Sequence, residues 1–201
     1  MTEKQIFVAM TGASGSIYGL RLMKELCSRG FGVTAAFSES GVLVCREETG
    51  LDLSAPPPVV VKRLTEHLEM DTSLFRVVSP DDLCAGVASG SAAADAMIIV
   101  PCSMGTVARI ACGISGNLIE RSADVMLKEH RPLLLVPRET PLSVIHLENM
   151  LKLAHAGARI IPAMPAFYNR PESIDDMVDF MVGKVLDQLK IENDLYTRWG
   201  N

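Results

Sequence analysis

Hydroxyl side chains follow a strongly apolar run near the middle of the chain. Residues 97–100 are Met-Ile-Ile-Val, and Ser103 and Thr106 come just after the Pro-Cys pair that ends this run. The small and aliphatic residues 107–112 are compatible with a helix. The first turn of a helix leaves backbone N–H groups unpaired, and these groups favour an anion. The segment therefore predicts either a ligand-binding turn or a plain helix N-cap.

Two other predicted strand ends carry polar chemistry of the same kind. Ser38 follows the run 32–37, and Arg138 and Glu139 follow the run 132–137. An arginine can hold a phosphate with two hydrogen bonds, and a glutamate can move a proton. The alternative is that Arg138 and Glu139 pair only with each other as a structural bridge. Because ligands bind at the carboxyl ends of strands in open α/β sheets, the three strand ends together favour a ligand site.

A turn rich in glycine and serine follows the first apolar run, residues 5–10. Its glycines are spaced by three and four residues, so the G-x-G-x-x-G fingerprint of dinucleotide-binding proteins is not met. The glycines alone fit a tight turn between a strand and a helix. Ser14 and Ser16, beside the start of the predicted helix 17–26, suit an anion such as one phosphate.

Two cations, Arg121 and Lys128, lie seven residues apart on the predicted helix 118–130 and therefore share one face. On spacing alone, a solvated basic face is the favoured interpretation. The adjacent acids Glu47 and Glu48 likewise fit solvated surface charges, which is the default for neighbouring carboxylates.

The composition is that of an ordinary globular protein and argues against several functions. The 201 residues are 48% hydrophobic and 21% charged, which is enough for one domain with a sizeable core. The formal net charge of -5 disfavours a nucleic-acid surface, although a local basic pocket is compatible with it. No apolar run approaches the roughly 20 residues of a membrane helix. The amino terminus lacks a signal-peptide pattern.

Cysteine usage indicates a reducing compartment. The five cysteines are odd in number and none are spaced as C-x-x-C, so neither a disulfide framework nor a zinc site is indicated. We therefore expect a cytoplasmic protein in which most cysteines are small core residues. Cys102 lies at the central turn, but no histidine near it in sequence is placed to activate its thiol.

Strand-like runs alternate with helical patterns along the whole chain. The alternation predicts a single α/β domain over residues 1–201, with one doubly wound, mostly parallel sheet of the Rossmann or flavodoxin type and helices on both faces. Aromatic residues are only 5%, so the core should be aliphatic. The expected strands are 5–10, 32–37, 74–78, 97–100, 132–137 and 158–162. The expected helices are 17–26, 42–50, 107–112, 118–130, 143–156 and 173–190, and the last of them starts with the cap pattern Ser-Ile-Asp-Asp at 173–176.

Turn-forming residues predict the segments between these elements. The triple proline 56–58 predicts a stiff extended spacer, followed by a short strand at 59–61. The acids Asp81 and Asp82 predict a helix start. Residues 86–94 are mostly small and predict a loop or a short helix.

Aromatic residues stand out in the last part of the chain. The proline-rich loop 163–171 carries Phe and Tyr, and such loops usually cover a ligand or a partner. The tail, about 191–201, contains the only tryptophan, Trp199. We expect this tail to contact a neighbouring subunit in an oligomer.

Five short motifs stand in a fixed order along nearly the whole chain, and together they strongly resemble those of the UbiX-type flavin prenyltransferases. The motifs around 137–142 and 165–168 are the specific ones, whereas the Gly-Ala-Ser-Gly loop is shared by a wider group of flavin-binding proteins. The motifs are Thr-Gly-Ala-Ser-Gly at 11–15 with Ile-Tyr-Gly at 17–19, Val-Pro-Cys-Ser-Met-Gly-Thr at 100–106, Arg-Ser-Ala-Asp-Val at 121–125, Val-Pro-Arg-Glu-Thr-Pro-Leu at 136–142, and Pro-Ala-Met-Pro-Ala-Phe-Tyr at 162–168.

The resemblance implies a metal-independent prenyl transfer. Such enzymes move a dimethylallyl group from dimethylallyl phosphate to N5 and C6 of reduced FMN. The product, prenylated FMN, serves a decarboxylase of the UbiD type, as in ubiquinone synthesis or aromatic-acid decarboxylation. The resemblance also implies a large homo-oligomer such as a dodecamer. It leaves open whether the diphosphate form of the prenyl donor is also used.

The resemblance further implies site residues, position by position. The expected FMN-binding residues are Gly12, Ala13, Ser14, Ser38, Ser103, Met104, Gly105, Thr106 and Arg138. The expected residues for the prenyl phosphate are Tyr168, Lys184, Arg121 and Lys128, some of them from a neighbouring subunit. Glu139 is expected to move protons, and Ser14 and Glu48 are expected to take part in catalysis. Some members of the family that the chain resembles have arginine at position 184. Lysine is a point charge without the guanidinium fork, so it lacks the bidentate grip with which arginine holds a phosphate.

Two other functions stay open at this point. The first is an FMN-dependent decarboxylase of the same fold that oxidises a C-terminal cysteine. That group relies on a histidine near the start of the first helix and on a Pro-x-Met-Asn motif, whereas this chain has Tyr18 and the sequence Pro-Ala-Phe-Tyr at 165–168. The second is a flavin-binding or carrier subunit without catalysis, against which the presence of Arg138, Glu139 and Tyr168 argues.

Overall fold

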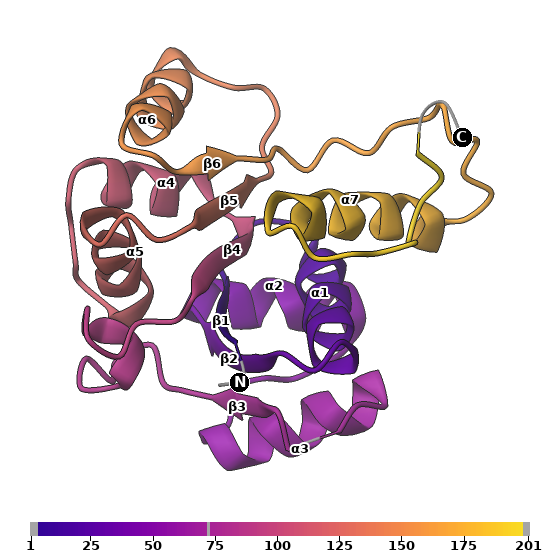
Figure 1. The fold of residues 1–201 in the computed structure, drawn as a ribbon, viewed down its shortest axis with the longest axis horizontal. Helices are drawn as coiled ribbons and strands as arrows, with labels where there is room; N and C mark the ends of the chain where they lie inside the picture. Colours follow the sequence, from indigo (N-terminus) through magenta and orange to yellow (C-terminus); the bar gives the residue numbers. More distant parts are fainter. Residues whose placement is uncertain (1–3, 72, 199–201) are drawn as a thin grey trace.

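Six parallel strands form one sheet in the computed structural model, which describes residues 4–71 and 73–198 (Figure 1). The strand order is β3-β2-β1-β4-β5-β6. It therefore reverses between β1 and β4, the point at which doubly wound sheets bind their ligands. The strands are β1 (Gln5–Met10), β2 (Gly32–Phe37), β3 (Phe75–Val77), β4 (Ala96–Cys102), β5 (Leu133–Pro137) and β6 (Arg159–Ile160).

Helices cover both faces of the sheet, so the predicted doubly wound α/β fold is confirmed (Figure 1). One face carries α1 (Ser16–Ser28), α2 (Glu39–Thr49), α3 (Pro57–Leu68) and α7 (Ile174–Gln188). The other face carries α4 (Met104–Ala111), α5 (Leu118–Lys128) and α6 (Val144–His155). Within the described part of the chain, none of these helices is both long and apolar enough to cross a membrane.

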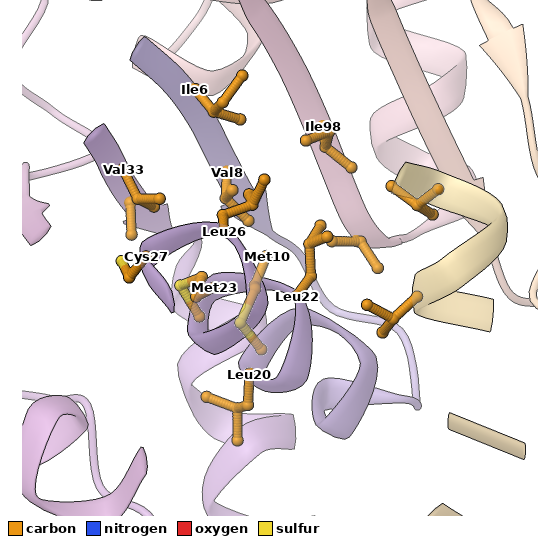
Figure 2. Packing of buried hydrophobic residues seen from close by; sticks show 14 of the residues in the cluster. Ile6, Val8, Met10, Leu20, Leu22, Met23, Leu26, Cys27, Val33 and Ile98 are labelled. Carbon is orange, nitrogen blue, oxygen red and sulfur yellow. The ribbon is translucent and has the colours of Figure 1, made fainter. Parts of the chain in front are cut away.

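Alternate strand residues divide the core into two clusters. In β1, Ile6 and Val8 pack into the cluster beneath α1, whereas Phe7 and Ala9 pack into the cluster beneath α4 and α5. Full burial of one aliphatic side chain contributes about 2 kcal/mol, so both clusters stabilise the sheet substantially. Figure 2 shows the first cluster, in which the strands meet Leu20, Leu22, Met23 and Leu26 of α1.

Side-chain caps fix where several helices begin. Ser173 and Asp176 form a capping box at the start of α7, as the sequence predicts. Ser38 caps α2, and this helix begins at Glu39 rather than at residue 42. The apolar pattern predicts the start too late because the first turn of α2 is polar, whereas the cap fixes the true start.

The triple-proline segment is helical rather than extended. The predictions of a spacer at 56–58 and a strand at 59–61 are wrong, because α3 begins at Pro57 and continues through both. Proline fits the first turn of a helix, where its missing N–H would have no intrahelical partner anyway. Val60 and Leu64 are both buried and lie one helical turn apart. The three consecutive valines at 59–61 hide this helical spacing in the sequence.

The acids after Pro80 form a turn rather than a helix start. The carboxylate of Asp82 accepts a hydrogen bond from the backbone N–H of Cys84 at 3.0 Å. Such local bonds from aspartate compete with helix formation, so the predicted helix start at Asp81 and Asp82 is wrong. A single 3₁₀ turn follows at Gly86–Ala88, in agreement with the predicted loop or short helix.

The tail after α7 packs against its own chain as far as residue 198. Trp199 lies outside the described residues. The predicted contact between the tail and a neighbouring subunit therefore stays a prediction.

Replacing Gly19 with alanine tests how closely α1 approaches the carboxyl end of β4. A Cβ at Gly19 would lie 2.5 Å from the carbonyl oxygen of Val100 and 2.9 Å from the sulfur of Met10. Although alanine is the better helix residue, we expect overpacking to lower the free energy of unfolding by about 1–3 kcal/mol. Urea denaturation measures this change.

Gly86→Ala is the control, because its Cβ would meet nothing nearer than Ala92 at 3.6 Å. We expect it to change the free energy of unfolding by less than about 0.5 kcal/mol. Equal stability of the wild type and Gly19→Ala would contradict the close packing of α1 on β4.

Candidate functional site

A buried threonine connects the ends of β1 and β4 at the point where the strand order reverses. The backbone N–H and the hydroxyl of Thr11 both donate to the carbonyl oxygen of Pro101, at 3.1 and 3.2 Å. The same hydroxyl oxygen accepts a hydrogen bond from the backbone N–H of Ser103 at 2.8 Å. Thr11 is only 2% exposed. It is not among the site residues expected from the sequence, although its position directly after a strand was an available signal.

The serines at the strand ends cap the helices that follow. The hydroxyl oxygen of Ser38 accepts from the backbone N–H of Gly41 at 3.0 Å, and that of Ser103 accepts from Thr106 at 3.2 Å. The cap interpretation is therefore correct for Ser103, and Ser38, for which the sequence predicts only a place at a strand end, is a cap as well. A capping hydroxyl still has its own proton to donate, and other N–H groups of the first turn lack intrahelical partners. The carboxyl edge thus presents two helix N-termini with donors available to a ligand.

Arg138 connects the end of β5 to the loop after β1. Its backbone N–H donates to the carbonyl oxygen of Cys102 at 3.4 Å, and its Nε donates to the carbonyl oxygen of Ser14 at 3.4 Å. Glu139 is exposed and accepts from the backbone N–H of Thr140 at 3.0 Å. Among the described residues, Arg138 and Glu139 thus have partners other than each other, and they do not form the alternative structural bridge.

The carboxylate of Glu48 occupies the N-terminus of α1. It accepts from the backbone N–H of Gly15 at 3.0 and 3.1 Å and from that of Ser16 at 2.8 Å. A carboxylate of the chain itself therefore lies at the turn where the sequence predicts an anion, and Glu48, although exposed, is more than a solvated surface charge. Burial raises the pKa of Glu48, but hydrogen bonds from Ser14, Ser16 and Gly15 outweigh it, so the pKa lies below its ordinary value.

A second group of expected residues gathers around Phe180 of α7. The ring of Tyr168 meets that of Phe180 edge-on, with 5.9 Å between centroids. The Lys184 ammonium lies 5.4 Å from the centroid of Phe180 and 4.8 Å from that of Tyr196. Phe180 and Tyr196 are not among the site residues expected from the sequence, although Phe180 stands one helical turn before Lys184. Tyr168 and Lys184, two of the expected phosphate-binding residues, thus contact the same ring, that of Phe180.

The other two expected phosphate-binding residues lie on the opposite face of the sheet. Arg121 and Lys128 belong to α5, where Arg121 pairs with Asp124 at 3.1 Å and Lys128 pairs with Glu129 at 2.6 Å. Lys128 also lies beside Gly90, in the segment that leads into β4 at the amino edge of the sheet. One chain therefore does not bring Arg121 and Lys128 together with Lys184.

The buried carboxylate of Glu120 is linked through Arg109 to the first turn of α4. Glu120 is 2% exposed, pairs with Nε of Arg109 and accepts from the backbone N–H of Gly116 at 2.9 Å. Arg109 in turn donates to the hydroxyl oxygen of Thr106 at 3.4 Å. These bonds orient the Thr106 hydroxyl next to Ser103. The available signal was an acid on the apolar side of a predicted helix, which is costly unless it is paired.

The thiol at the site is held in its neutral form. Cys102 is fully buried, and burial raises its pKa to about 12 despite the nearby charge of Arg109. Cys27 and Cys45 are buried as well, whereas Cys84 and Cys112 are exposed. In residues 4–71 and 73–198, no three Asp, Glu, His or Cys side chains gather in an arrangement that could bind a metal ion.

Two cavities of the chain have neither Ser38 nor Ser103 in their lining. One, of about 660 Å³, lies at the amino edge of the sheet and includes Lys4 and Arg159 in its lining. The other, of about 560 Å³, lies between α1 and α7, with Arg21 and Asp179 in its lining and Glu48 in its wall. The candidate site is therefore defined by the hydrogen bonds at the carboxyl edge rather than by either cavity.

Comparison with known proteins relates the chain to flavin-binding proteins. The family profile described as Flavoprotein matches residues 1–186. A flavin prenyltransferase UbiX of Halalkalibacterium halodurans is 52% identical over 193 residues, which cover 96% of this chain and 92% of the relative. A flavin prenyltransferase UbiX of Pseudomonas aeruginosa is 49% identical over 197 residues, which cover 98% of this chain and 94% of the relative.

Solved structures with the same fold include UbiX proteins. AnUbiX, solved in complex with FMN and dimethylallyl pyrophosphate, has a TM-score of 0.87 and 39% identity, covering 99% of this chain and 98% of that one. A dodecameric FMN-dependent UbiX-like decarboxylase of Escherichia coli O157:H7 has a TM-score of 0.86 and 39% identity, covering 98% of this chain and 100% of that one. A PPC decarboxylase with 16% identity and a TM-score of 0.65 shares the fold alone.

Glu48→Gln tests the carboxylate at the N-terminus of α1. Because the folded pKa of Glu48 lies below its ordinary value of 4.5, the carboxylate stabilises the fold above that value, and the effect is lost as the pH falls through the folded pKa. We expect Glu48→Gln to lower the free energy of unfolding by about 0.5–1 kcal/mol at pH 7. The difference should shrink between about pH 5 and pH 3.

Glu47→Gln is the matched control, since Glu47 pairs with Arg46 at the surface, at 3.5 Å. This variant should stay within about 0.5 kcal/mol of the wild type at every pH. A loss of stability in Glu48→Gln that did not change with pH would contradict the assignment.

Proposed function

The chain belongs to the flavoprotein family and, within it, to the flavin prenyltransferases named UbiX, and from this membership we propose how its residues act. The reaction moves a dimethylallyl group from dimethylallyl phosphate to N5 and C6 of reduced FMN and yields prenylated FMN. The observation that carries the residue assignments is the hydrogen-bonded junction of the β1, β4 and β5 ends through Thr11, Ser103 and Arg138.

The junction has the features that flavin mononucleotide requires. The first turn of α4 presents backbone N–H groups, and a Cβ at Gly105 would meet nothing nearer than the Arg109 guanidinium at 3.4 Å, so no side chain blocks that surface. The half-buried Arg138 supplies a cation for the negative charge of FMN. We assign FMN binding to Gly12, Ala13, Ser14, Ser38, Ser103, Met104, Gly105, Thr106 and Arg138.

The prenyl donor requires concentrated positive charge around its phosphate. Reduced FMN supplies the electron-rich N5 and C6 positions at which the two new bonds form. In our assignment Tyr168 and Lys184, joined through Phe180, bind the phosphate from one chain. Cations at this point favour departure of the phosphate, and the face of Tyr168 suits the positive charge that develops on the dimethylallyl group.

Proton movement falls to two carboxylates, that of Glu139 after β5 and that of Glu48 near the end of α2. Glu139 is exposed at the end of β5, next to Arg138, where it is accessible to a ligand at the carboxyl edge. Bond formation at C6 requires loss of a proton, and we assign its removal to Glu139. Glu48 accepts a hydrogen bond from the Ser14 hydroxyl and thereby orients that hydroxyl.

Arg121 and Lys128 complete the phosphate pocket from a neighbouring subunit in our proposal. Their position on α5, across the sheet from α7, supports this arrangement. A relative of the same fold, the UbiX-like protein of Escherichia coli O157:H7, is dodecameric. The assembly of this chain is therefore a homo-oligomer whose sites draw on more than one copy.

The product leaves for a second enzyme in the proposed pathway. Prenylated FMN has its use as a cofactor, so a UbiD-type decarboxylase is the proposed recipient. A cytoplasmic location, which the cysteine pattern predicts, fits both this chain and the proposed recipient. It stays a prediction.

Glu139→Gln tests the proton role of Glu139. The amide keeps the shape and polarity of the side chain but does not act as a base at neutral pH, so FMN should bind with unchanged affinity. Prenyl transfer should slow by about 10²- to 10⁴-fold. Anaerobic turnover with reduced FMN and dimethylallyl phosphate measures the rate, and fluorescence titration measures FMN affinity.

Glu66→Gln is the matched control, because Glu66 is an exposed glutamate of α3 that pairs with Lys62 at 3.8 Å, outside the site. Its turnover should equal that of the wild type. Unchanged turnover in Glu139→Gln would refute the proton role of Glu139. The assignment of the FMN-binding residues would still stand.

Mixed oligomers test whether two subunits share one site. Lys128→Ala and Lys184→Ala should each slow turnover strongly when present in every subunit. When the two variants are co-expressed, about a quarter of the sites receive both native lysines by random assembly. Turnover should therefore recover to a comparable fraction of wild type.

The control mixture combines Lys184→Ala with Tyr168→Phe, since both residues contact Phe180 of the same chain. This mixture should not exceed the average of its two parent variants. Failure of the Lys128→Ala and Lys184→Ala mixture to recover would contradict the proposal that Lys128 and Lys184 of two subunits share one site.

A further inference from the structure

The tail of the chain is fastened to α7 by one carboxylate. After α7 the chain turns back and runs along the helix (Figure 1). Asp187 accepts from the Tyr196 hydroxyl at 2.6 Å, from Nδ2 of Asn193 at 2.9 Å and from the Arg198 guanidinium at 2.7 Å. Three tail residues thus converge on a single acid, which fixes the position of the tail.

This attachment places the ring of Tyr196 against Lys184. The ammonium of Lys184 lies 4.8 Å from the centroid of Tyr196 and 5.4 Å from that of Phe180. The two rings meet edge-on, with 5.1 Å between centroids. The fit requires glycine at position 183, because a Cβ there would lie 2.5 Å from the Tyr196 ring. Lys184 therefore lies between two aromatic faces instead of extending freely into solvent.

The aromatic contacts orient the ammonium without neutralising its charge. A lysine has a flexible stem and lacks the planar fork of arginine, so its direction depends on what surrounds it. Ring faces attract a cation but carry no net charge. The nearby carboxylate of Asp187 is balanced by Arg198. A hydrogen bond with Tyr196 also raises the pKa of Lys184 more than partial burial lowers it. The side chain thus stays cationic and available to an anion.

We infer that Tyr196 is a positioning residue that aims Lys184 at the phosphate of the prenyl donor, with Asp187 and Arg198 holding Tyr196 in place. The inference rests on the proposed phosphate-binding role of Lys184. It extends the site to the tail, since the same aromatic group also includes Tyr168 through Phe180. The tail then contributes to donor affinity through Lys184 rather than by touching the donor itself.

A double-mutant cycle between Tyr196 and Lys184 tests the inference. Lys184→Ala should raise the KM for dimethylallyl phosphate roughly tenfold or more through loss of a charged hydrogen bond. Tyr196→Leu should raise it about three- to tenfold through loss of the ring. In the Lys184→Ala background, Tyr196→Leu should have no further effect. The affinity for FMN should be the same in all of these proteins.

Conservative and control variants separate positioning from general damage. Tyr196→Phe loses the hydrogen bonds of the hydroxyl with Asp187, Lys184 and Arg198 but keeps the ring against the ammonium, so its KM should stay within about twofold of wild type. Asp194→Asn changes a tail carboxylate whose side chain is 99% exposed, and it should leave KM unchanged. Should Tyr196→Leu fail to fold, Arg198→Ala replaces it in the cycle, with an expected rise in KM of about threefold.

The outcomes distinguish this inference from the proposed function. A rise in KM with Lys184→Ala, but none with Tyr196→Leu, would overturn the inference and leave the phosphate role of Lys184 intact. A Tyr196→Leu effect that persists undiminished in the Lys184→Ala background would overturn it as well. An unchanged KM in Lys184→Ala would overturn both the inference and the proposed role of Lys184.

Discussion

The arrangement of the carboxyl edge depends on one buried hydroxyl. Thr11 donates to the end of β4 and accepts from Ser103, which itself caps α4, so a single side chain sets the start of that helix relative to β1. A valine of similar shape would leave the Ser103 N–H without this partner. Because the strand order reverses here, these bonds fix the relative position of the two loops at the crevice in which doubly wound sheets bind ligands. Arg138 extends the junction to β5.

The same topology limits what one chain can do alone. Helices cover both faces of this parallel sheet, and α5 and α7 lie on opposite sides of it. In the proposed site, cations on both helices meet at one phosphate only when copies of the chain assemble. The exposed apolar side chains of α6, with Val144 at 69% and Ile145 at 67%, fit such an assembly, because isolated subunits rarely expose several large aliphatic residues on one helix. Oligomerisation and catalysis are therefore linked in this account.

Much of the fold could be predicted from the sequence, because the signals were local. The apolar runs of β1 and β2, and the cap at Ser173, each lie within a few residues, and the structure has them where the pattern places them. The resemblance supplied the family, and the comparisons confirm it. The helix α3 was missed because β-branched residues after prolines favour an extended chain locally, whereas packing of Val60 and Leu64 decides the outcome.

The site was harder to predict, because its bonds join residues that are distant in the sequence. Glu48 reaches Gly15 across 33 positions, and Thr11 reaches Pro101 across 90. No pattern within one segment shows that a surface glutamate will satisfy a helix N-terminus elsewhere, or that Tyr196 will lie on Lys184. Such contacts are determined by strand order and by the return of the tail along α7, which are properties of the whole fold.

The mass of the flavin after reaction tests the central claim most directly. The purified protein is incubated under nitrogen with FMN, a reductant and dimethylallyl phosphate, and the flavin is then released for mass spectrometry. The account predicts a flavin heavier by one prenyl unit. Unmodified FMN that is bound by the protein but inert to the prenyl donor would contradict prenyl transfer at this edge. A protein that binds no flavin at all would contradict the assignment of the strand ends themselves.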